Sequence, residues 1–401
     1  MLGRRGPRGR TNARGRIGEG AHRGRAAAAP SRAGRALERF RALSGGAAAR
    51  ERAGPGLFLL GHGRLGGEGG RGPRRELSSK AGSAIYAGDA PGARLEEGSA
   101  ARIFTGAPIP IGADSVVRQE TAREESGRVS FRAAPAPGEN VRSKGEDVAE
   151  GGTALEAGVR LGPRQLGLCA ALGAREVEVA ARLSVALIPT GDELVRGLVE
   201  DSNRVVLAAD IASLGCDVTW QVSGDDPHEL ERALEAARAR ADVVLTTAGV
   251  SVGEKDLVPG VLARMGAEVR VHGVAMKPGK PFLFAQLGGK AVFGLPGSPS
   301  ACLVAYEVFV RPFIRGLCGS RSRRRTVLEL PLAERVEGRP GRMRFFWANL
   351  TRDGRVQPLG QDIAQLRGPA LAQALVALPA DVGEVEAGAR VQAWLLEEAS
   401  P

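Results

Sequence analysis

The chain of 401 residues is poor in cysteine, histidine and aromatic residues, and this scarcity excludes several classes of protein. It has four cysteines, and none stands at the C-x-x-C spacing of a zinc or redox centre. Four are also too few for a disulfide framework, so we interpret Cys169, Cys216, Cys302 and Cys318 as reduced, mostly buried thiols in the cytoplasm. No apolar run approaches the roughly eighteen residues of a membrane-spanning helix, so no membrane span is expected.

Positive charge is concentrated in the first fifth of the chain. The net charge is +11, but residues 1–80 hold 18 arginines and one lysine against five glutamates, which leaves −3 for the other 321 residues. Residues 1–81 also lack Val, Asp, Tyr and Trp, so we expect a low-complexity Arg/Gly-rich tail without stable structure. A nucleic acid could bind such a tail, but no interleaved aromatic residues support base stacking, and we do not favour that partner.

The pattern of the remaining chain changes three times. Short strand candidates separated by Gly, Pro and Asp predict a β-rich domain over residues 82–137. Residues 138–183 are expected to form a connector that contains one short helix, Pro163–Leu172. Apolar strands alternate with helices over 184–320, which predicts an α/β domain with a mainly parallel sheet covered on both faces. Residues 325–398 alternate strands and turns, which predicts a small C-terminal β-barrel.

Four polar, glycine-bearing loops each follow a strand-like run of the predicted α/β domain. They are Thr190–Leu194, Thr247–Asp256, Lys277–Pro281 and Leu295–Pro299. Parallel strands end at a common sheet edge, where α/β proteins hold anionic ligands, so we expect these loops to converge on one such ligand. The second loop lacks the Gly-Lys-[Ser/Thr] ending of a P-loop, so the sequence does not support nucleotide hydrolysis.

The side chains of these loops are typical of a phosphate site. Lys277 and Lys280 are separated by a Pro-Gly turn and can both direct their ammonium groups at one phosphate. The carboxylates of Asp192 and Glu193 would repel a phosphate unless a divalent cation lies between them, which predicts Mg²⁺. A helix cap and a solvated glutamate would explain the same two residues without a ligand. Asp256 is placed to begin a helix, whose free N–H groups suit an anion.

At these loops the chain resembles the molybdopterin molybdenumtransferases, the family that includes the gephyrin E domain. The resemblance runs from about Gly82 to Leu396, and four further segments carry it: Arg102–Pro108, Gly138–Arg142, Lys144–Asp147 and Pro340–Arg342. It implies a four-part subunit that forms a homodimer. Its expected fold class is α/β, with a mainly parallel α/β sandwich domain of the molybdopterin-binding type, flanking β-rich domains and a C-terminal β-barrel.

The resemblance also implies an activity and a set of site residues. The reaction would be the Mg²⁺-dependent insertion of molybdate into adenylyl-molybdopterin with release of AMP, with other cofactor-biosynthesis proteins as further partners. Glu193, Asp256, Lys277 and Lys280 would be catalytic, and Glu193, Asp225 and Asp256 would hold the metal. The substrate-binding positions would be Thr105, Arg142, Asp147, Thr190, Gly191, Asp225, Gly249, Ser251, Gly297, Ser298, Pro299 and Arg342.

The sequence differs from the family pattern at several positions. Residues 1–81 contain no counterpart of the family's Ser-Ala-Met-Asp-Gly-Tyr-Ala segment, and Ile363 stands where a serine is usual. Ala248 stands where a second glycine is usual, and Ser298 stands where asparagine is usual. A catalytically impaired pterin-binding or scaffold protein therefore stays open as a second hypothesis. A third is the related molybdopterin adenylyltransferase, but that family has only the single α/β domain, and the flanking β domains argue against it.

Overall fold

The structure is a computed structural model. It describes residues 84–90, 94–96, 99–131, 135–251, 253, 256–360 and 366–396, together with the backbone of three short strands nearer the N-terminus. None of the helices in these ranges combines the length and the apolar character that crossing a membrane requires.

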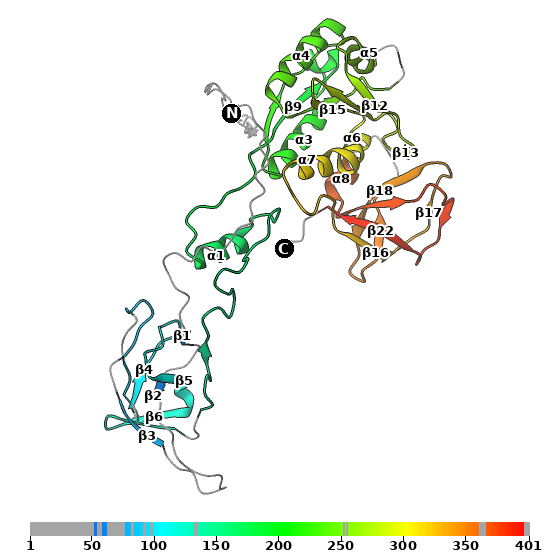
Figure 1. Ribbon diagram of the computed structural model, residues 1–401. Helices are drawn as coiled ribbons and strands as arrows, with labels where there is room; N and C mark the ends of the chain where they lie inside the picture. Colours follow the sequence, from blue (N-terminus) through cyan, green and yellow to red (C-terminus); the bar gives the residue numbers. More distant parts are fainter. Residues whose placement is uncertain are drawn as a thin grey trace, which may run out of the picture. The chain divides into compact units, whose positions relative to one another are not determined.

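The N-terminal part contains a six-stranded sheet with the order β5-β2-β4-β3-β7-β6 and a small pair of strands, β1 and β8 (Figure 1). The strands are β1 Arg52–Ala53, β2 Phe58–Gly61, β3 Leu77–Ala81, β4 Ser99–Arg102, β5 Ala113–Val117, β6 Ala122–Glu125, β7 Arg128–Phe131 and β8 Val141–Arg142, with a 3₁₀ turn η1 at Gln119–Thr121. Buried Ile85, Ile103, Val116, Val129 and Phe131 supply its apolar interior.

This sheet begins earlier in the chain than the domain boundary that we placed between residues 81 and 82. Strand β2 pairs with β4 and β5, and β3 pairs with β4 and β7, so both belong to the sheet. The Phe-Leu-Leu-Gly run of β2 is a local apolar signal that the average composition of the first eighty residues concealed. The rest of the predicted tail lies outside the described residues.

The connector holds the short helix that the sequence predicted. Helix α1 spans Pro163–Ala171, one residue shorter than expected. Pro163 opens it, where a missing N–H costs nothing, and Gly173 follows its end with a φ of +78°.

The central part is an α/β domain with a six-stranded sheet of order β10-β9-β11-β15-β14-β12 (Figure 1). Its strands are β9 Ser184–Pro189, β10 Asp217–Trp220, β11 Val243–Thr247, β12 Glu268–His272, β14 Leu283–Leu287 and β15 Lys290–Leu295. Its helices are α2 Asp192–Val195, α3 Ser202–Ser213, α4 Pro227–Arg240, α5 Leu257–Arg264, α6 Pro299–Ala305 and α7 Arg311–Leu317, with a π-helical turn η2 at Tyr306–Val310. The first four strands of the order are mutually parallel, which confirms the predicted mainly parallel sheet.

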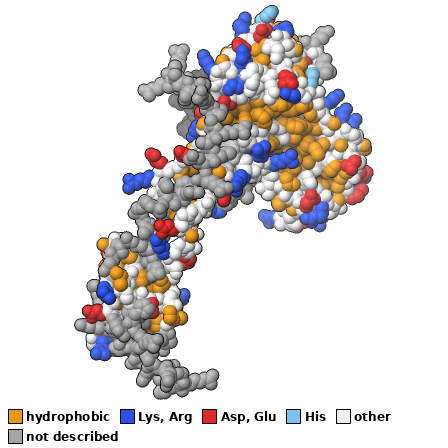
Figure 2. Space-filling model, viewed as in Figure 1, with side chains coloured by type: hydrophobic (Ala, Val, Ile, Leu, Met, Phe, Trp, Pro, Cys, Tyr) orange, Lys and Arg blue, Asp and Glu red, His pale blue; other side chains and the backbone are white. Residues whose placement is uncertain are grey.

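Helices cover both faces of this sheet, and alternate residues of its strands pack on opposite sides. Val243 and Leu245 of β11 belong to the apolar cluster that includes α3, α6 and α7, whereas Val244 between them packs with α4 and α5. This alternation is the pattern of a strand that is buried on both faces. Phe284 and Phe309 are half-buried members of the first cluster. Figure 2 shows that apolar side chains also gather on the viewed face of the molecule.

The C-terminal part is a β-rich unit. Its main sheet has the order β13-β18-β20-β22-β16, with β19 paired to β18, and β17 pairs with β21. The elements are β13 Met276–Lys277, β16 Val327–Pro331, β17 Val336–Glu337, β18 Met343–Leu350, β19 Val356–Pro358, β20 Ala374–Leu378, β21 Glu384–Val385, β22 Arg390–Leu395 and the helix α8 Arg367–Leu371. Strand β13 comes from the predicted lysine loop of the α/β domain, so that loop contributes directly to the C-terminal sheet.

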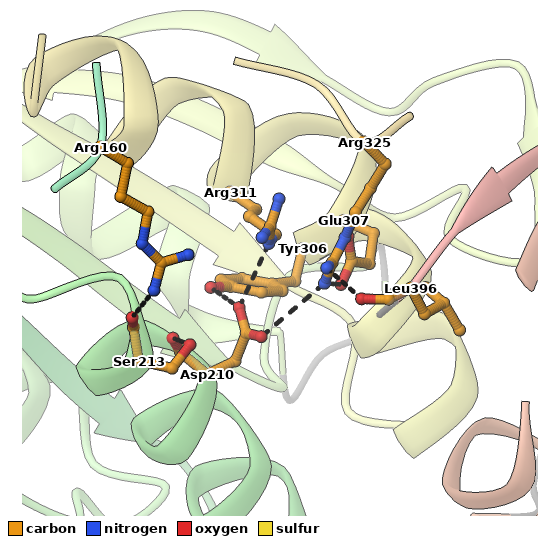
Figure 3. A network of polar contacts seen from close by, with 8 residues as sticks. All are labelled: Arg160, Asp210, Ser213, Tyr306, Glu307, Arg311, Arg325 and Leu396. Carbon is orange, nitrogen blue, oxygen red and sulfur yellow. Dashed lines mark hydrogen bonds and ion pairs between the residues drawn. The ribbon is translucent and has the colours of Figure 1, made fainter. Parts of the chain in front are cut away.

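A network of buried charges joins the α/β domain to the C-terminal unit (Figure 3). Arg325, in the segment between the two, donates to both carboxylate oxygens of Glu307 in η2 and to the carbonyl of Leu396 after β22. Asp210 of α3 accepts the Tyr306 hydroxyl at 2.6 Å and pairs with Arg311 at 3.5 Å. The two acids and two arginines balance each other's charge, so they can be buried together.

Candidate functional site

The sheet topology brings the four predicted loops to one edge. Strands β9, β11 and β15 are parallel, so the loops after Pro189, Thr247 and Leu295 leave the sheet on the same side. Strand β12 is antiparallel to β14, and β14 is antiparallel to β15, so β12 also ends on that side. The lysine loop follows β12. The prediction that these loops share one sheet edge is therefore confirmed by the strand pairing.

Hydrogen bonds between loop residues hold this edge together. The Thr190 N–H and hydroxyl both donate to the carbonyl of Thr247, at 3.0 and 3.1 Å. Ala248 N–H donates to the Leu295 carbonyl at 3.0 Å, and the Gly249 carbonyl accepts from Val258 N–H of α5 at 3.0 Å. The buried Thr190 hydroxyl donates its proton to the neighbouring loop and so helps to position it, and direct ligand binding by Thr190 stays a prediction.

Two residues show how tightly the backbone is folded here. Gly191 has a φ of +145°, and the Glu193 carboxylate lies directly over it, where a β-carbon would collide with that group. Ala248 has a φ of +70°, in the left-handed region that glycine adopts freely and alanine adopts only at a cost of about 1 kcal/mol. The glycine that the family usually has at this position is thus explained by the backbone conformation.

The acidic residues of this edge are held by local hydrogen bonds. Asp192 Oδ1 accepts from the N–H of Asp225 at 3.0 Å, which ties the loop after β9 to the loop after β10. Asp256 Oδ2 accepts from Gly253 N–H at 2.7 Å. Asp226 accepts from two N–H groups of α4 at 2.8 Å each, and these bonds lower the pKa of its carboxyl. Asp226 is therefore the helix cap that its position before Pro227 predicted.

No group of three or more His, Cys, Asp or Glu residues is arranged to hold a metal ion within the part of the chain that the structure describes. Glu193, Asp225 and Asp256, which we expected to act as metal ligands, are therefore not gathered into a ready ligand set. Glu193 is exposed, and Asp225 and Asp256 are half-buried. Asp256 turns its carboxylate toward Gly253, and metal binding by the three residues stays a prediction.

The lysine loop combines positive charge from two parts of the chain. Lys277 lies on β13, whose register places it opposite Arg344 of β18, and Met343 N–H donates to the Ala275 carbonyl at 2.9 Å. Arg342 precedes Met343 and so lies beside the same loop. Lys280 is exposed and Lys277 is half-buried.

Sequence reasoning missed Arg344. Burial lowers the pKa of its guanidinium, and Arg339 acts in the same direction, whereas Glu337 opposes the change. Only the pairing of β13 with β18 places Arg344 beside Lys277, so no local sequence signal could have identified it.

The loop after β15 completes the edge. Gly297 and Ser298 are exposed, and Pro299 begins α6. The carbonyl of Gly297 accepts from the side-chain amide of Asn203 in α3 at 2.8 Å. Ser251, in the loop after β11, is also exposed. These groups leave a backbone-rich surface next to the charged loops.

The other predicted positions lie in the N-terminal and connector parts. Thr105, Arg142 and Asp147 are exposed, and Arg142 lies on β8. Their contribution to the same site stays a prediction. Ile363 lies outside the described residues.

Comparisons with known proteins agree with this architecture. Family profiles match along the chain: "MoeA N-terminal region (domain I and II)" at residues 44–173, "Probable molybdopterin binding domain" at 186–316 and "MoeA C-terminal region (domain IV)" at 329–396. Molybdopterin molybdenumtransferase 2 of Mycobacterium tuberculosis is 35% identical over 325 residues, which cover 77% of this chain and 80% of that protein. The chain belongs to the molybdopterin molybdenumtransferase family.

Other members of the molybdopterin molybdenumtransferase family match different lengths of this chain. The molybdopterin molybdenumtransferase of Haemophilus influenzae is 41% identical over 232 residues, and the matched part spans 57% of that relative and 56% of this chain. The crystal structure of the molybdopterin biosynthesis protein MoeA from Pyrococcus horikosii superposes with a TM-score of 0.68 at 28% identity, covering 87% of this chain and 88% of that one. The first profile begins at residue 44 and so includes β1, β2 and β3, in agreement with the early start of the sheet.

Proposed function

We propose that this protein inserts molybdate into adenylyl-molybdopterin and releases AMP, as a step of molybdenum cofactor biosynthesis. The observation that carries the proposal is the shared sheet edge, where the lysine loop, its neighbouring arginines and the polar loops after β9, β11 and β15 lie together. The names of the relatives support the choice of substrate, since the matched proteins are called molybdopterin molybdenumtransferases.

The basic residues would bind the anionic parts of the substrates. Lys277 and Lys280 belong to one loop, and Arg342 directly precedes β18, the strand that pairs with this loop. Fixed positive groups stabilise charge that develops on a leaving phosphate, because they need no reorganisation during the reaction. We assign the lysines to the phosphate that leaves with adenylate, and Arg342 to the molybdate oxyanion.

The loop backbones would orient these groups. Thr190 fixes the loop after β11, and through it Gly249 and Ser251, relative to the loop after β9. Gly297, Ser298 and Pro299 form the wall beside them. Holding the reactants in one geometry lowers the entropic part of the barrier, and this is the main contribution that we assign to the loops.

The donor set of this edge fits Mg²⁺ bound together with substrate. Mg²⁺ at phosphate sites is commonly held by one or two carboxylates, waters and the phosphate oxygens themselves. The exposed Glu193 and the half-buried Asp225 and Asp256 could supply these carboxylates without forming a ligand set beforehand. When bound, the ion would neutralise negative charge on the phosphoanhydride.

We also propose a cytoplasmic homodimer, with adenylyl-molybdopterin, molybdate and other cofactor-biosynthesis proteins as partners. The support is the family relationship and the absence of any membrane-spanning helix among those that the structure describes. Light scattering coupled to gel filtration would test the dimer, and a monomeric mass at micromolar concentration would contradict it.

The deciding experiment is AMP release by the full-length protein. We expect AMP to appear when adenylyl-molybdopterin, molybdate and Mg²⁺ are all present, and to disappear when EDTA removes the metal. Lys280→Ala should lose most of the activity, whereas Lys290→Ala should keep it, because Lys290 pairs with Asp242 at the opposite end of the sheet. Pterin binding without AMP release would instead favour the impaired or scaffold protein, to which Ile363 and the missing segment point.

A further inference from the structure

Asn203 has one hydrogen-bonding group that is used and one that is not. It is the second residue of α3, and its side chain is buried, with 9% of the residue exposed. The amide Nδ2 donates to the carbonyl of Gly297 at 2.8 Å. The amide oxygen Oδ1 is buried and has no hydrogen-bond partner among the described residues. A buried acceptor without a donor is costly, so such a group indicates a missing partner.

The neighbours of Asn203 are already occupied. Asp201 Oδ1 caps α3 by accepting from Arg204 N–H at 2.9 Å, and its Oδ2 lies 3.4 Å from Arg204 Nε. The guanidinium of Arg204 lies 4.1 Å from the ring centre of Trp220, in a cation–π contact. These contacts fix the start of α3 and account for the positions of the Asp201 and Arg204 side chains. Asp201 Oδ2 also lacks a hydrogen bond, but the Arg204 guanidinium offsets its charge, whereas Asn203 Oδ1 has neither a hydrogen bond nor an ion pair among the described residues.

The bond to Gly297 places Asn203 at the proposed active site. Gly297 lies in the loop after β15, and a β-carbon on it would come within 3.0 Å of the Ala248 side chain in the loop after β11. The asparagine amide is uncharged and offers an acceptor, so it is poorly suited to phosphate or molybdate, which are themselves acceptors. Its oxygen is suited to an N–H donor.

We infer that Asn203 is a specificity-determining residue whose Oδ1 accepts a hydrogen bond from an exocyclic amino group on a fused nitrogen heterocycle of the substrate. This inference rests on the proposed function, because adenylyl-molybdopterin carries two such heterocycles, adenine and the pterin. Both have an exocyclic amino group, and an experiment can separate them.

The test compares ligands that differ only at the amino group. Calorimetric titration of the full chain would use AMP against purine riboside 5′-monophosphate, which lacks the amino group, and pterin-6-carboxylate against lumazine-6-carboxylate, in which an oxo group replaces it. We expect the wild type to bind the amino member of one pair about tenfold more tightly. The pair that shows the difference identifies the heterocycle.

Asn203→Leu keeps the approximate volume and removes both polar groups. It should weaken binding of the amino member alone, so that the ratio within the pair falls to about one, whereas a general disturbance of the site would weaken both members equally. Ser202→Ala, on the neighbouring residue of the same turn, should keep the wild-type ratio. Equal weakening of both members by Asn203→Leu would overturn the inference.

The wild type alone also tests the idea, whatever the stability of the variant. If it binds the ligands and shows no preference within either pair, the inference is wrong while AMP release by the same preparation still supports the proposed function. If it neither binds any of the four ligands nor releases AMP, both the inference and the proposed function fail.

Discussion

Replacing Arg325 tests whether buried charge holds the C-terminal unit against the α/β domain. Its side chain is 8% exposed and that of Glu307 is 9% exposed, with 2.7 and 3.0 Å between the guanidinium nitrogens and the carboxylate oxygens. Arg325→Met would keep much of the aliphatic stem but leave the Glu307 carboxylate with less compensation. Breaking a buried pair from one side typically costs about 3–5 kcal/mol, because the remaining charge stays buried.

The double variant separates charge from packing. Arg325→Met with Glu307→Leu removes both charges, so most of the lost stability should return. The bond from Arg325 to the Leu396 carbonyl is not restored, and we expect a residual loss of about 1 kcal/mol for it. Asp210, which also lies near Arg325 at 3.8 Å, is more exposed and contributes less.

Urea unfolding followed by tryptophan fluorescence would measure these changes, because Trp347 and Trp394 lie in strands β18 and β22 of the C-terminal unit. Arg238→Met is the matched control, since it breaks an exposed pair with Glu235 on α4 and should change little. A loss below about 1 kcal/mol for Arg325→Met would refute the reasoning. So would a double variant that is less stable than the single one.

Three further predictions concern the candidate site and a thiol. Lys280→Ala should weaken AMP binding about tenfold or more in calorimetry without changing the melting temperature, and an unchanged dissociation constant would remove Lys280 from the site. Ala248→Gly should raise the free energy of unfolding by about 1 kcal/mol, because glycine adopts a φ of +70° without strain. The control Ala263→Gly, inside α5, should lower the free energy of unfolding by a similar amount. If both variants changed the free energy of unfolding in the same direction, the backbone of Ala248 would not be strained. A hydrogen bond from Cys216, helped by the charge of Arg315, lowers the pKa of the half-buried Cys318 thiol to about 7. The rate of Cys318 alkylation by iodoacetamide should therefore rise with pH and reach half its maximum near pH 7. A midpoint near the ordinary thiol pKa of about 8.5 would disprove this prediction.

Local sequence signals were sufficient for most elements of the α/β domain. Asp226 followed by Pro227 predicted a helix start, and α4 begins at Pro227 with Asp226 as its cap. Helix α3 ends just before Gly215, as the glycine indicated. Such signals work because caps, prolines and glycines act through backbone groups only a few residues away.

The loops were predictable for a related reason. Polar residues directly after apolar runs fall at strand ends, and parallel strands end together, so the placement of Thr190 and of the lysine loop at one sheet edge needed only the strand order. The sequence did not reveal the β2 and β3 pairings, because a composition averaged over eighty residues hides a four-residue strand.

What the chain determined by itself is therefore the alternation of strands and helices and the chemistry of the loops at one sheet edge, since both depend on residues close together in sequence. Only the tertiary structure decided which groups are available there. It placed Arg344 beside Lys277, used the Thr190 hydroxyl for a neighbouring carbonyl and left Asn203 Oδ1 without a partner among the described residues. Each of these outcomes depends on a contact between segments distant in sequence, where the geometry of packing, and not residue type, determines which atoms meet.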